Sequence, residues 1–189
     1  MRLSNTFKAV ALSAVLAAGS LGAVAHAQDN PTVGGAAMFA DRTIVENAVN
    51  SPVHTTLVAA VQAAGLVDTL NSAGPFTVFA PVNDAFAALP AGTVDTLLME
   101  ANRDQLTAVL TYHVVPGKLS GSELLRRANA GGSEAQLTTV QGGTLTVVPS
   151  GRGVAVVDAG GNQSTVTTVD VNQSNGVIHV VNRVLLPAM

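Results

Sequence analysis

Histidine has the widest chemical repertoire of the residues in this chain, because its imidazole binds metals and exchanges protons near neutral pH. Beyond the first 27 residues, the histidines are His54, His113 and His179. None stands three or four residues from another, as zinc-binding histidines usually do, and there is no cysteine to complete a zinc site. The sequence therefore predicts no metal centre.

Catalytic motifs are also missing from the sequence. It contains no Gly-x-Ser-x-Gly elbow of a serine hydrolase, no phosphate-binding loop and no dinucleotide fingerprint. The lack of cysteine excludes thiol catalysis. A glycosidase carboxylate pair is a spatial arrangement that spacing does not reveal, and a hydrolase built on His113 and Asp84 stays open as the lowest-ranked alternative. We expect a protein that is not an enzyme, with no catalytic residue and no cofactor.

His113 ends a helical pattern and stands beside Tyr112, before the apolar pair Val114-Val115. Two interpretations are open. In the first, the imidazole is mostly buried and donates a hydrogen bond to a carboxylate or carbonyl, with Asp84 as the expected partner. In the second, Tyr112 and His113 form an exposed recognition pair. The apolar flanks favour the first interpretation.

The other two histidines have simpler expected places. His179 alternates with Ile178 and Val180, so a strand would put it on the face opposite these neighbours, within a core strand. His54 falls in the first turn of a predicted helix, where we expect it to be solvated.

The N-terminus has the pattern of a secretory signal peptide. Arg2 and Lys8 precede an apolar run over residues 9–18, and Ala25-His26-Ala27 is a typical cleavage site. The run is too short to span a membrane, and no later run is long and apolar enough. We therefore expect cleavage near Ala27 and a secreted or periplasmic protein that does not span a membrane.

The net charge excludes one class of partner, and the cysteine content excludes disulfide bonds. Without residues 1–27, seven basic residues stand against twelve acidic ones, a formal charge of −5. Nucleic acid is excluded as a partner, because phosphate binding needs clustered Lys and Arg. With no cysteine in the chain, no disulfide can help, so the hydrophobic core alone must stabilise the fold.

Hydrophobic periodicity divides the chain into a helical first half and a strand-rich second half. Residues 28–41 are small and polar, as in a flexible leader, and the single folded domain is expected over 42–189. Helical patterns cover 42–50, 52–64, 93–99, 103–112 and the segment after Ser120, with a strand at 76–80 and a helix capped by Asn83 or Asp84. Strands are predicted at 137–140, 144–148, 154–157, 165–169 and 177–186. The order indicates an α+β fold.

Two segments also resemble the signature boxes of a known domain family. They are residues 74–86, Gly-Pro-Phe-Thr-Val-Phe-Ala-Pro-Val-Asn-Asp-Ala-Phe, and residues 175–187, with Tyr112-His113 between them. In this order they resemble the fasciclin (FAS1) domain and its Tyr-His pair. Val82 stands where the family usually has threonine, and Asn182 where aspartate is usual. The motif residues of the two boxes are Phe76, Phe79, Pro81, Asn83, Asp84, Phe86, Gly176, Ile178 and His179.

The resemblance implies a wedge-shaped β-sandwich of about seven strands with several helices packed over one edge. It gives the box residues a structural role in the core. The pair Asp170-Val171 corresponds to the Asp-Ile pair that is linked to integrin binding in animal FAS1 domains, and the Tyr-His pair has been linked to the same contacts. Tyr112, His113, Asp170 and Val171 are therefore candidate interaction residues.

The resemblance also implies a function. FAS1 domains are mostly secreted adhesion modules, so we expect a non-catalytic module for contact with cells, biofilm, host surfaces or extracellular matrix. Its partner would be a cell-surface or matrix protein or a polysaccharide, and a single domain would have to form a homo-oligomer or bind such partners to cross-link anything. The alternative is a soluble carrier of an apolar small molecule such as a carotenoid, because some FAS1 proteins resemble water-soluble carotenoid binders.

Overall fold

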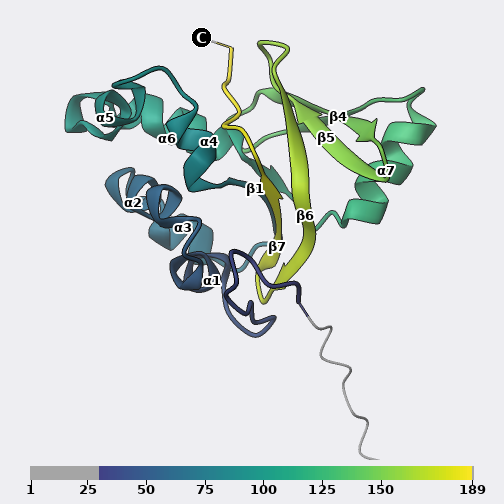
Figure 1. The fold of residues 1–189 in the computed structure, drawn as a ribbon, viewed down its shortest axis with the longest axis horizontal. Helices are drawn as coiled ribbons and strands as arrows, with labels where there is room; N and C mark the ends of the chain where they lie inside the picture. The colour runs from purple at the N-terminus through teal and green to yellow at the C-terminus, as the bar shows by residue number, and fades with distance from the viewer. Residues whose placement is uncertain (1–29, 189) are drawn as a thin grey trace, which may run out of the picture.

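A strongly curved sheet with helices packed around it forms the fold in the computed structural model, which describes residues 30–188 (Figure 1). The seven strands of the described part follow the order β2-β1-β7-β6-β5-β4-β3 across the sheet. Their bounds are β1 Phe76–Pro81, β2 Val114–Pro116, β3 Ala135–Thr138, β4 Thr144–Ser150, β5 Gly153–Val157, β6 Gln163–Gln173 and β7 Gly176–Val181.

The helices divide into two groups around the sheet. Most lie on the side of β1 and β7, and α7 packs against β3, β4 and β5 on the other side (Figure 1). The helices are α1 Ile44–Asn50, α2 Thr55–Ala63, α3 Val67–Asn71, α4 Asn83–Ala87, α5 Thr93–Leu98, the 3-10 turn η1 Glu100–Asn102, α6 Arg103–Tyr112 and α7 Gly121–Ala130. The predicted α+β class and the expected seven strands are thus confirmed.

The sheet is mixed and almost closes on itself. Strands β3 to β7 run antiparallel in chain order, β1 pairs with β7 in parallel, and β2 pairs with β1 in antiparallel. After β3, the N–H of Val140 donates to the carbonyl of Val114 in β2 at 2.8 Å. This bond links the two ends of the sheet, so the curved sheet has nearly the form of a barrel.

Two hydrophobic cores follow from this arrangement. The first lies between the helices before β2 and strands β1 and β7, and includes Ile44, Leu57, Phe86, Leu110 and Ile178. The second lies inside the curved sheet and under α7, and includes Phe79, Tyr112, Leu124, Leu145, Val156 and Leu185. Alternate residues of β1 therefore serve different cores, because successive side chains of a strand point to opposite faces.

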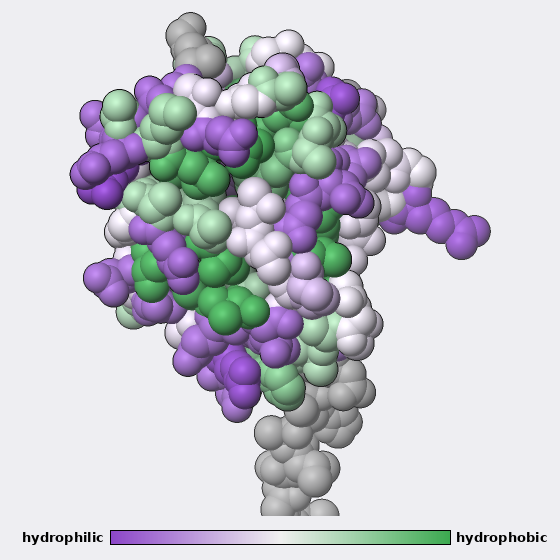
Figure 2. All heavy atoms as spheres, turned by 60° about the vertical axis from the view of Figure 1, so that its left-hand side comes forward, coloured by the Kyte–Doolittle hydropathy of each residue, from purple (hydrophilic) through white to green (hydrophobic). Residues whose placement is uncertain are grey.

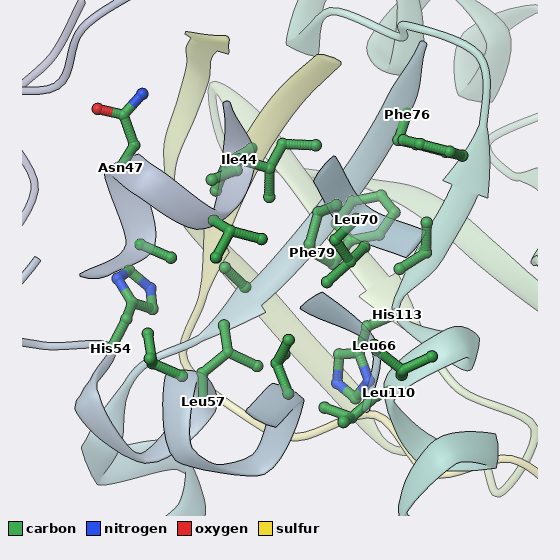
Figure 3. A pocket seen from close by; sticks show the side chains of 18 of the residues that line it. Ile44, Asn47, His54, Leu57, Leu66, Leu70, Phe76, Phe79, Leu110 and His113 are labelled. Atoms are coloured by element: carbon green, nitrogen blue, oxygen red, sulfur yellow. The ribbon is translucent and has the colours of Figure 1, made fainter. Parts of the chain in front are cut away.

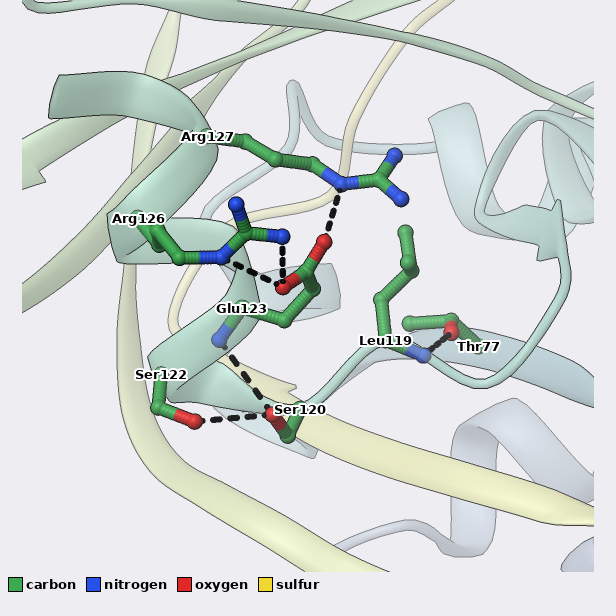
Figure 4. Close-up of polar contacts among 7 residues, drawn as sticks. All are labelled: Thr77, Leu119, Ser120, Ser122, Glu123, Arg126 and Arg127. Atoms are coloured by element: carbon green, nitrogen blue, oxygen red, sulfur yellow. Dashed lines mark hydrogen bonds and ion pairs between the residues drawn. The ribbon is translucent and has the colours of Figure 1, made fainter. Parts of the chain in front are cut away.

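The start of α7 is capped and braced by polar side chains (Figure 4). Ser120 Oγ accepts from the backbone N–H of Glu123, as the sequence pattern predicts. The carboxylate of Glu123 pairs with Arg126 and Arg127 on the exposed face of the helix. Just before the helix, Thr77 Oγ1 accepts from the N–H of Leu119 at 2.9 Å and so fixes the approach of the chain to α7.

The predicted cap of α4 is wrong. Val82 holds the N-cap position and no side chain caps this helix, while Asp84 is exposed. Asn83 caps a different helix: its Oδ1 accepts from the N–H of Thr56 at 3.0 Å, and its Nδ2 donates to the carbonyl of Pro52. The amide side chain at the start of α4 therefore satisfies one free backbone donor at the start of α2.

The described part of the expected leader, residues 30–41, lies against the domain. Asn30 exchanges two hydrogen bonds with the backbone of Asn172, and Val33 and Met38 are buried in the first core. Phe39 exchanges hydrogen bonds with the side chain of Asn47. The packing therefore extends before residue 42. The predicted signal peptide lies outside the described residues, and among the described helices none is long and apolar enough to cross a membrane.

Candidate functional site

Tyr112 and His113 lie at the end of α6, where the two cores meet. Tyr112 is 0% exposed and His113 is 3% exposed. The pair therefore does not form an outer surface, and its side chains hold together segments that are distant in the sequence.

His113 joins α6 to the C-terminal segment through both ring nitrogens. Nδ1 donates to the carbonyl of Val109 at 2.7 Å, and Nε2 accepts from the N–H of Leu185 at 2.9 Å. A neutral imidazole with its proton on Nδ1 satisfies both contacts. Burial lowers the pKa of His113 to about 4, against smaller opposing contributions from the Val109 carbonyl and Asp158.

The expected partnership of His113 with Asp84 is wrong. The acceptor is the carbonyl of Val109, and Asp84 is exposed at the start of α4. A carbonyl satisfies the imidazole donor without bringing a charge into the core. The arrangement also leaves His113 and Asp84 without the mutual contact on which the hydrolase alternative depended.

Tyr112 anchors two loops from beneath. Its hydroxyl donates to the carbonyl of Thr144 at 2.7 Å and accepts from the N–H of Ala159 at 3.0 Å. Burial raises the pKa of this phenol, so it remains a hydrogen-bond donor at neutral pH. The tyrosine thereby ties the end of α6 to the start of β4 and to the turn after β5.

His179 and Asp170 connect β6, β7 and α7. His179 Nε2 donates to the carbonyl of Leu119 at 2.8 Å, and its Nδ1 accepts from the N–H of Asp170 at 3.3 Å. Asp170 Oδ1 accepts from the N–H of Gly121 at the start of α7. Burial lowers the pKa of His179. Asp170 holds a left-handed backbone with φ 58° and is half-buried, and Val171 is fully buried.

The remaining box residues occupy the strands β1 and β7 and the helix α4. Phe79, Pro81, Phe86 and Ile178 are buried, and Phe76 is half-buried. The ring of Phe79 lies 5.7 Å from the ring of His179, centroid to centroid. Gly176 faces Phe76 across the β1–β7 pair. These residues hold the two strands together.

His54 is placed differently from the sequence-based expectation. It is the N-cap residue of α2, but it is only 3% exposed, because β1 and the cavity residues cover it. Its Nδ1 lies 2.8 Å from Ser51 Oγ, and its Nε2 has no hydrogen-bond partner. The expectation that His54 is solvated is wrong. The three-residue spacing of Ser51 and His54 at a helix start was the signal in the sequence, but burial depends on residues far along the chain.

An apolar cavity of about 70 Å³ lies beneath the short N-terminal helices (Figure 3). Its walls come from α1, α2, α3 and α6 and from the strands β1 and β7, and its accessible surface is apolar. In Figure 2, which brings the helical side forward, apolar side chains also gather on the surface between polar ones. Residues of the cavity wall include Ile44, Leu57, Leu66, Leu70, Val78 and Leu110.

A polar groove of about 690 Å³ lies over Tyr112 at the opposite core. It is lined by Gln136, Gln141, Thr144, Thr146 and Asp158. Asp158 is buried, and its carboxylate accepts from the backbone of Gly160, Asn162 and Leu186. The exposed part of the groove is therefore formed mainly by uncharged amides and hydroxyls, which can exchange hydrogen bonds with a partner.

The described residues bring together no group of three or more His, Asp or Glu side chains that could hold a metal ion. The buried histidines are separately engaged with backbone groups or with Ser51. The Ser51–His54 pair among them is hydrogen-bonded but buried beneath the helices. The geometry of residues 30–188 thus supports binding by a surface or by the apolar cavity.

Acid should destabilise the protein through its buried histidines. The pKa of His113 is about 6.5 in the unfolded chain and about 4 in the folded protein. As pH falls below about 6.5, the unfolded chain therefore binds a proton at His113, whereas the folded protein binds it only near pH 4. The unfolded state therefore holds more protons in this window, and stability falls as pH falls from about 6.5 to about 4, by up to about 3 kcal/mol for His113 alone. His54 and His179, whose pKa values are also lowered, act in the same direction.

Urea unfolding followed by circular dichroism between about pH 7 and pH 4 measures this effect. A free energy of unfolding that stays constant or rises on acidification would show that the histidines are not held neutral by the fold.

Comparison with known proteins gives one consistent result. The family model of the Fasciclin domain matches residues 52–187. Protein sll1483 of Synechocystis sp. is 46% identical over 162 residues, which are 86% of this chain and 83% of that protein. Immunogenic protein MPB70 of Mycobacterium bovis is 39% identical, with 95% of this chain and 89% of that protein covered. The solved FAS1 domain pair of the insect cell adhesion molecule Fasciclin I superposes with a TM-score of 0.69 at 19% identity, over 77% of this chain and 51% of that chain.

Proposed function

Because the chain belongs to the fasciclin family, we propose that it is a secreted, non-catalytic module for adhesion to a cell surface or extracellular matrix. The observation that carries the proposal is the family match over residues 52–187. Fasciclin I, whose solved domain pair superposes on this fold over 51% of its length, is an insect cell adhesion molecule. The partner would be a cell-surface or matrix protein or a polysaccharide, and the predicted signal peptide would direct the protein out of the cytoplasm.

The polar groove over Tyr112 is the contact surface that we propose first. Tyr112 and His113 are buried, so they would support this surface without contacting a partner. The contacts would come from the exposed residues that line the groove. Gln136 and Thr144 are exposed on neighbouring strands and line the groove. Their uncharged hydrogen-bonding groups suit a polysaccharide or a polar protein surface.

A second proposed contact lies at the end of β6, near Asp170. The Asp170 carboxylate is engaged with the start of α7, and Val171 is buried, so neither side chain is free to dominate a contact. Val169 is 37% exposed beside them. Two separate contacts, or self-association, would let one domain bridge two partners.

Truncating the groove should weaken adhesion without unfolding the protein. We expect the double variant Gln136→Ala/Thr144→Ala to lose about tenfold in affinity for producing cells or their matrix. This loss corresponds to about 1.4 kcal/mol, which lies within the range measured for truncated interface residues. The measurement is saturable binding of purified protein to cells and to isolated matrix.

The matched control is Gln163→Ala/Thr165→Ala, which removes the same two side-chain types from exposed positions of β6 that do not line the groove. It should bind like the wild type. Equal binding by both variants would remove the groove from the proposal, and absence of saturable binding by the wild type would count against adhesion itself.

A second candidate function is the soluble carriage of an apolar small molecule. The apolar cavity beneath α1, α2 and α3 favours it. At about 70 Å³ the cavity holds a small molecule or one end of a longer one, so a molecule as long as a carotenoid would leave most of its length outside.

A further inference from the structure

His54 forms part of the wall of the apolar cavity and has one unpaired nitrogen. Its ring lies at one side of the cavity in Figure 3, and the residue is 3% exposed. Among residues 30–188, Nε2 of His54 is the buried side-chain polar atom that lacks a hydrogen-bond partner. A buried donor or acceptor without a partner destabilises the folded protein, so a partner that is not part of the chain would relieve this cost.

The neighbouring serine decides which ring nitrogen carries the proton. The hydroxyl of Ser51 is buried and contacts His54 Nδ1 at 2.8 Å. If the hydroxyl donates to Nδ1, only the Nε2–H of His54 remains unpaired. If Nδ1 were the donor, both the hydroxyl hydrogen and Nε2 would lack partners. The first arrangement leaves fewer groups unsatisfied, so Nε2 offers a hydrogen to an acceptor.

The electrostatics of the cavity define the charge of a ligand. Burial lowers the pKa of His54 and keeps the ring neutral. The nearby backbone carbonyl of Ala80 raises this pKa by less, and its position relative to Nε2 lies outside hydrogen-bond geometry. No Asp, Glu, Lys or Arg lines the cavity. A charged ligand would lose its hydration without compensation there, so the ligand must be uncharged.

The size of the cavity defines the part of the ligand that it can enclose. At about 70 Å³ it has roughly half the volume of an apolar cavity that binds benzene, about 150 Å³. Because the accessible wall is apolar and Nε2 is covered, a ligand oxygen reaches the nitrogen only after neighbouring side chains shift. A few heavy atoms fit, either as a whole small molecule or as the end of a longer one.

We propose that this cavity binds an uncharged, mostly apolar molecule through a single oxygen acceptor that receives the hydrogen of His54 Nε2. A ketone, an ether or a hydroxyl supplies such an oxygen. The inference rests on the second candidate function and adds to it the polar contact that selects the ligand.

The test compares two four-heavy-atom probes of the same shape, acetone and 2-methylpropene, which differ by oxygen in place of a CH₂ group. With the wild-type protein, titration of the ketone should move the ¹⁵Nε2 resonance of His54, and the alkene should bind without moving it. His54→Phe should weaken ketone binding about fivefold, the worth of one hydrogen bond, and leave alkene binding nearly unchanged. Longer 2-alkanones distinguish a ligand that the cavity encloses whole from the end of a longer ligand. Affinity rises with chain length only if the tail of the ligand extends outside the cavity.

The control Ala48→Leu puts extra carbon atoms into the cavity wall and should abolish binding of both probes. If both probes bind and neither moves the His54 resonance, the proposed hydrogen bond is wrong, although the carrier function survives. If neither probe binds, both the inference and the carrier function fail. The resonance measurement uses the wild-type protein, so it tests the proposed hydrogen bond from His54 Nε2 even if His54→Phe does not fold.

Discussion

Replacing Gly176 by alanine should destabilise the protein by about 4 kcal/mol or more, enough to unfold a domain of ordinary stability. Gly176 begins β7 and lies opposite Phe76 in the parallel β1–β7 pair. A Cβ atom at this position would overlap with the carbonyl oxygen of Phe76, which is backbone and has no rotamer by which to move away. The two central strands would have to separate, and the cores on both of their faces would open.

Gly153→Ala is the matched control, because Gly153 also begins a strand, β5, and also has an ordinary backbone conformation. The nearest atom to its added Cβ, Ser150 O, lies 3.9 Å away, which is an ordinary contact. We expect a change below about 1 kcal/mol for this variant. Thermal and urea unfolding of the two variants gives the comparison, and equal stability would show that β1 and β7 do not approach as closely as described.

The substitution His113→Leu should cost about 3 kcal/mol of stability without changing the surface of the protein. Leucine has a similar volume but no nitrogen, so the buried N–H of Leu185 would lose its acceptor and the carbonyl of Val109 its donor. An unpaired buried N–H alone costs about 1–3 kcal/mol. Unfolding in urea at about pH 7 measures the loss.

The dependence of this loss on pH separates the hydrogen bonds from simple packing. His113 in the wild type contributes less as pH falls from about 6.5 to about 4, and leucine does not titrate. The difference in free energy of unfolding between the wild type and His113→Leu should therefore shrink on acidification. A difference that is constant with pH would mean that volume alone matters at this position, and a loss of cell binding by folded His113→Leu would give the residue a direct recognition role.

The sequence predicted the fold well where local pattern and core position agree. Strand β1 ends at Pro81, close to the predicted boundary. The strand predicted at 177–186 is shorter in the structure, because β7 ends at Val181. The predicted strand at 165–169 is longer in the structure, because β6 continues through register shifts and the left-handed Asp170, which break the alternation of side chains. The strand β2 has three residues and shows no periodicity to detect.

The contacts of the candidate site were harder to predict, because they join distant segments. His113 was expected to be buried and bonded, but the acceptor Val109 and the donor Leu185 are backbone groups, which every residue has. Asn83 was expected to cap the helix next to it, and it caps α2 from 27 residues away. The local sequence pattern predicts that a buried histidine or a free helix end needs a hydrogen-bond partner. Only the fold determines which distant segment supplies that partner.

The pairing of β1 with β7 also constrains when the protein can fold. Phe76 and Gly176 are neighbours in the sheet but 100 residues apart in the chain, and contacts of such long range form slowly. During synthesis, β1 has no parallel partner until nearly the whole chain has been made. A nascent chain would therefore remain open through most of its elongation, which is compatible with the export that we propose for this protein.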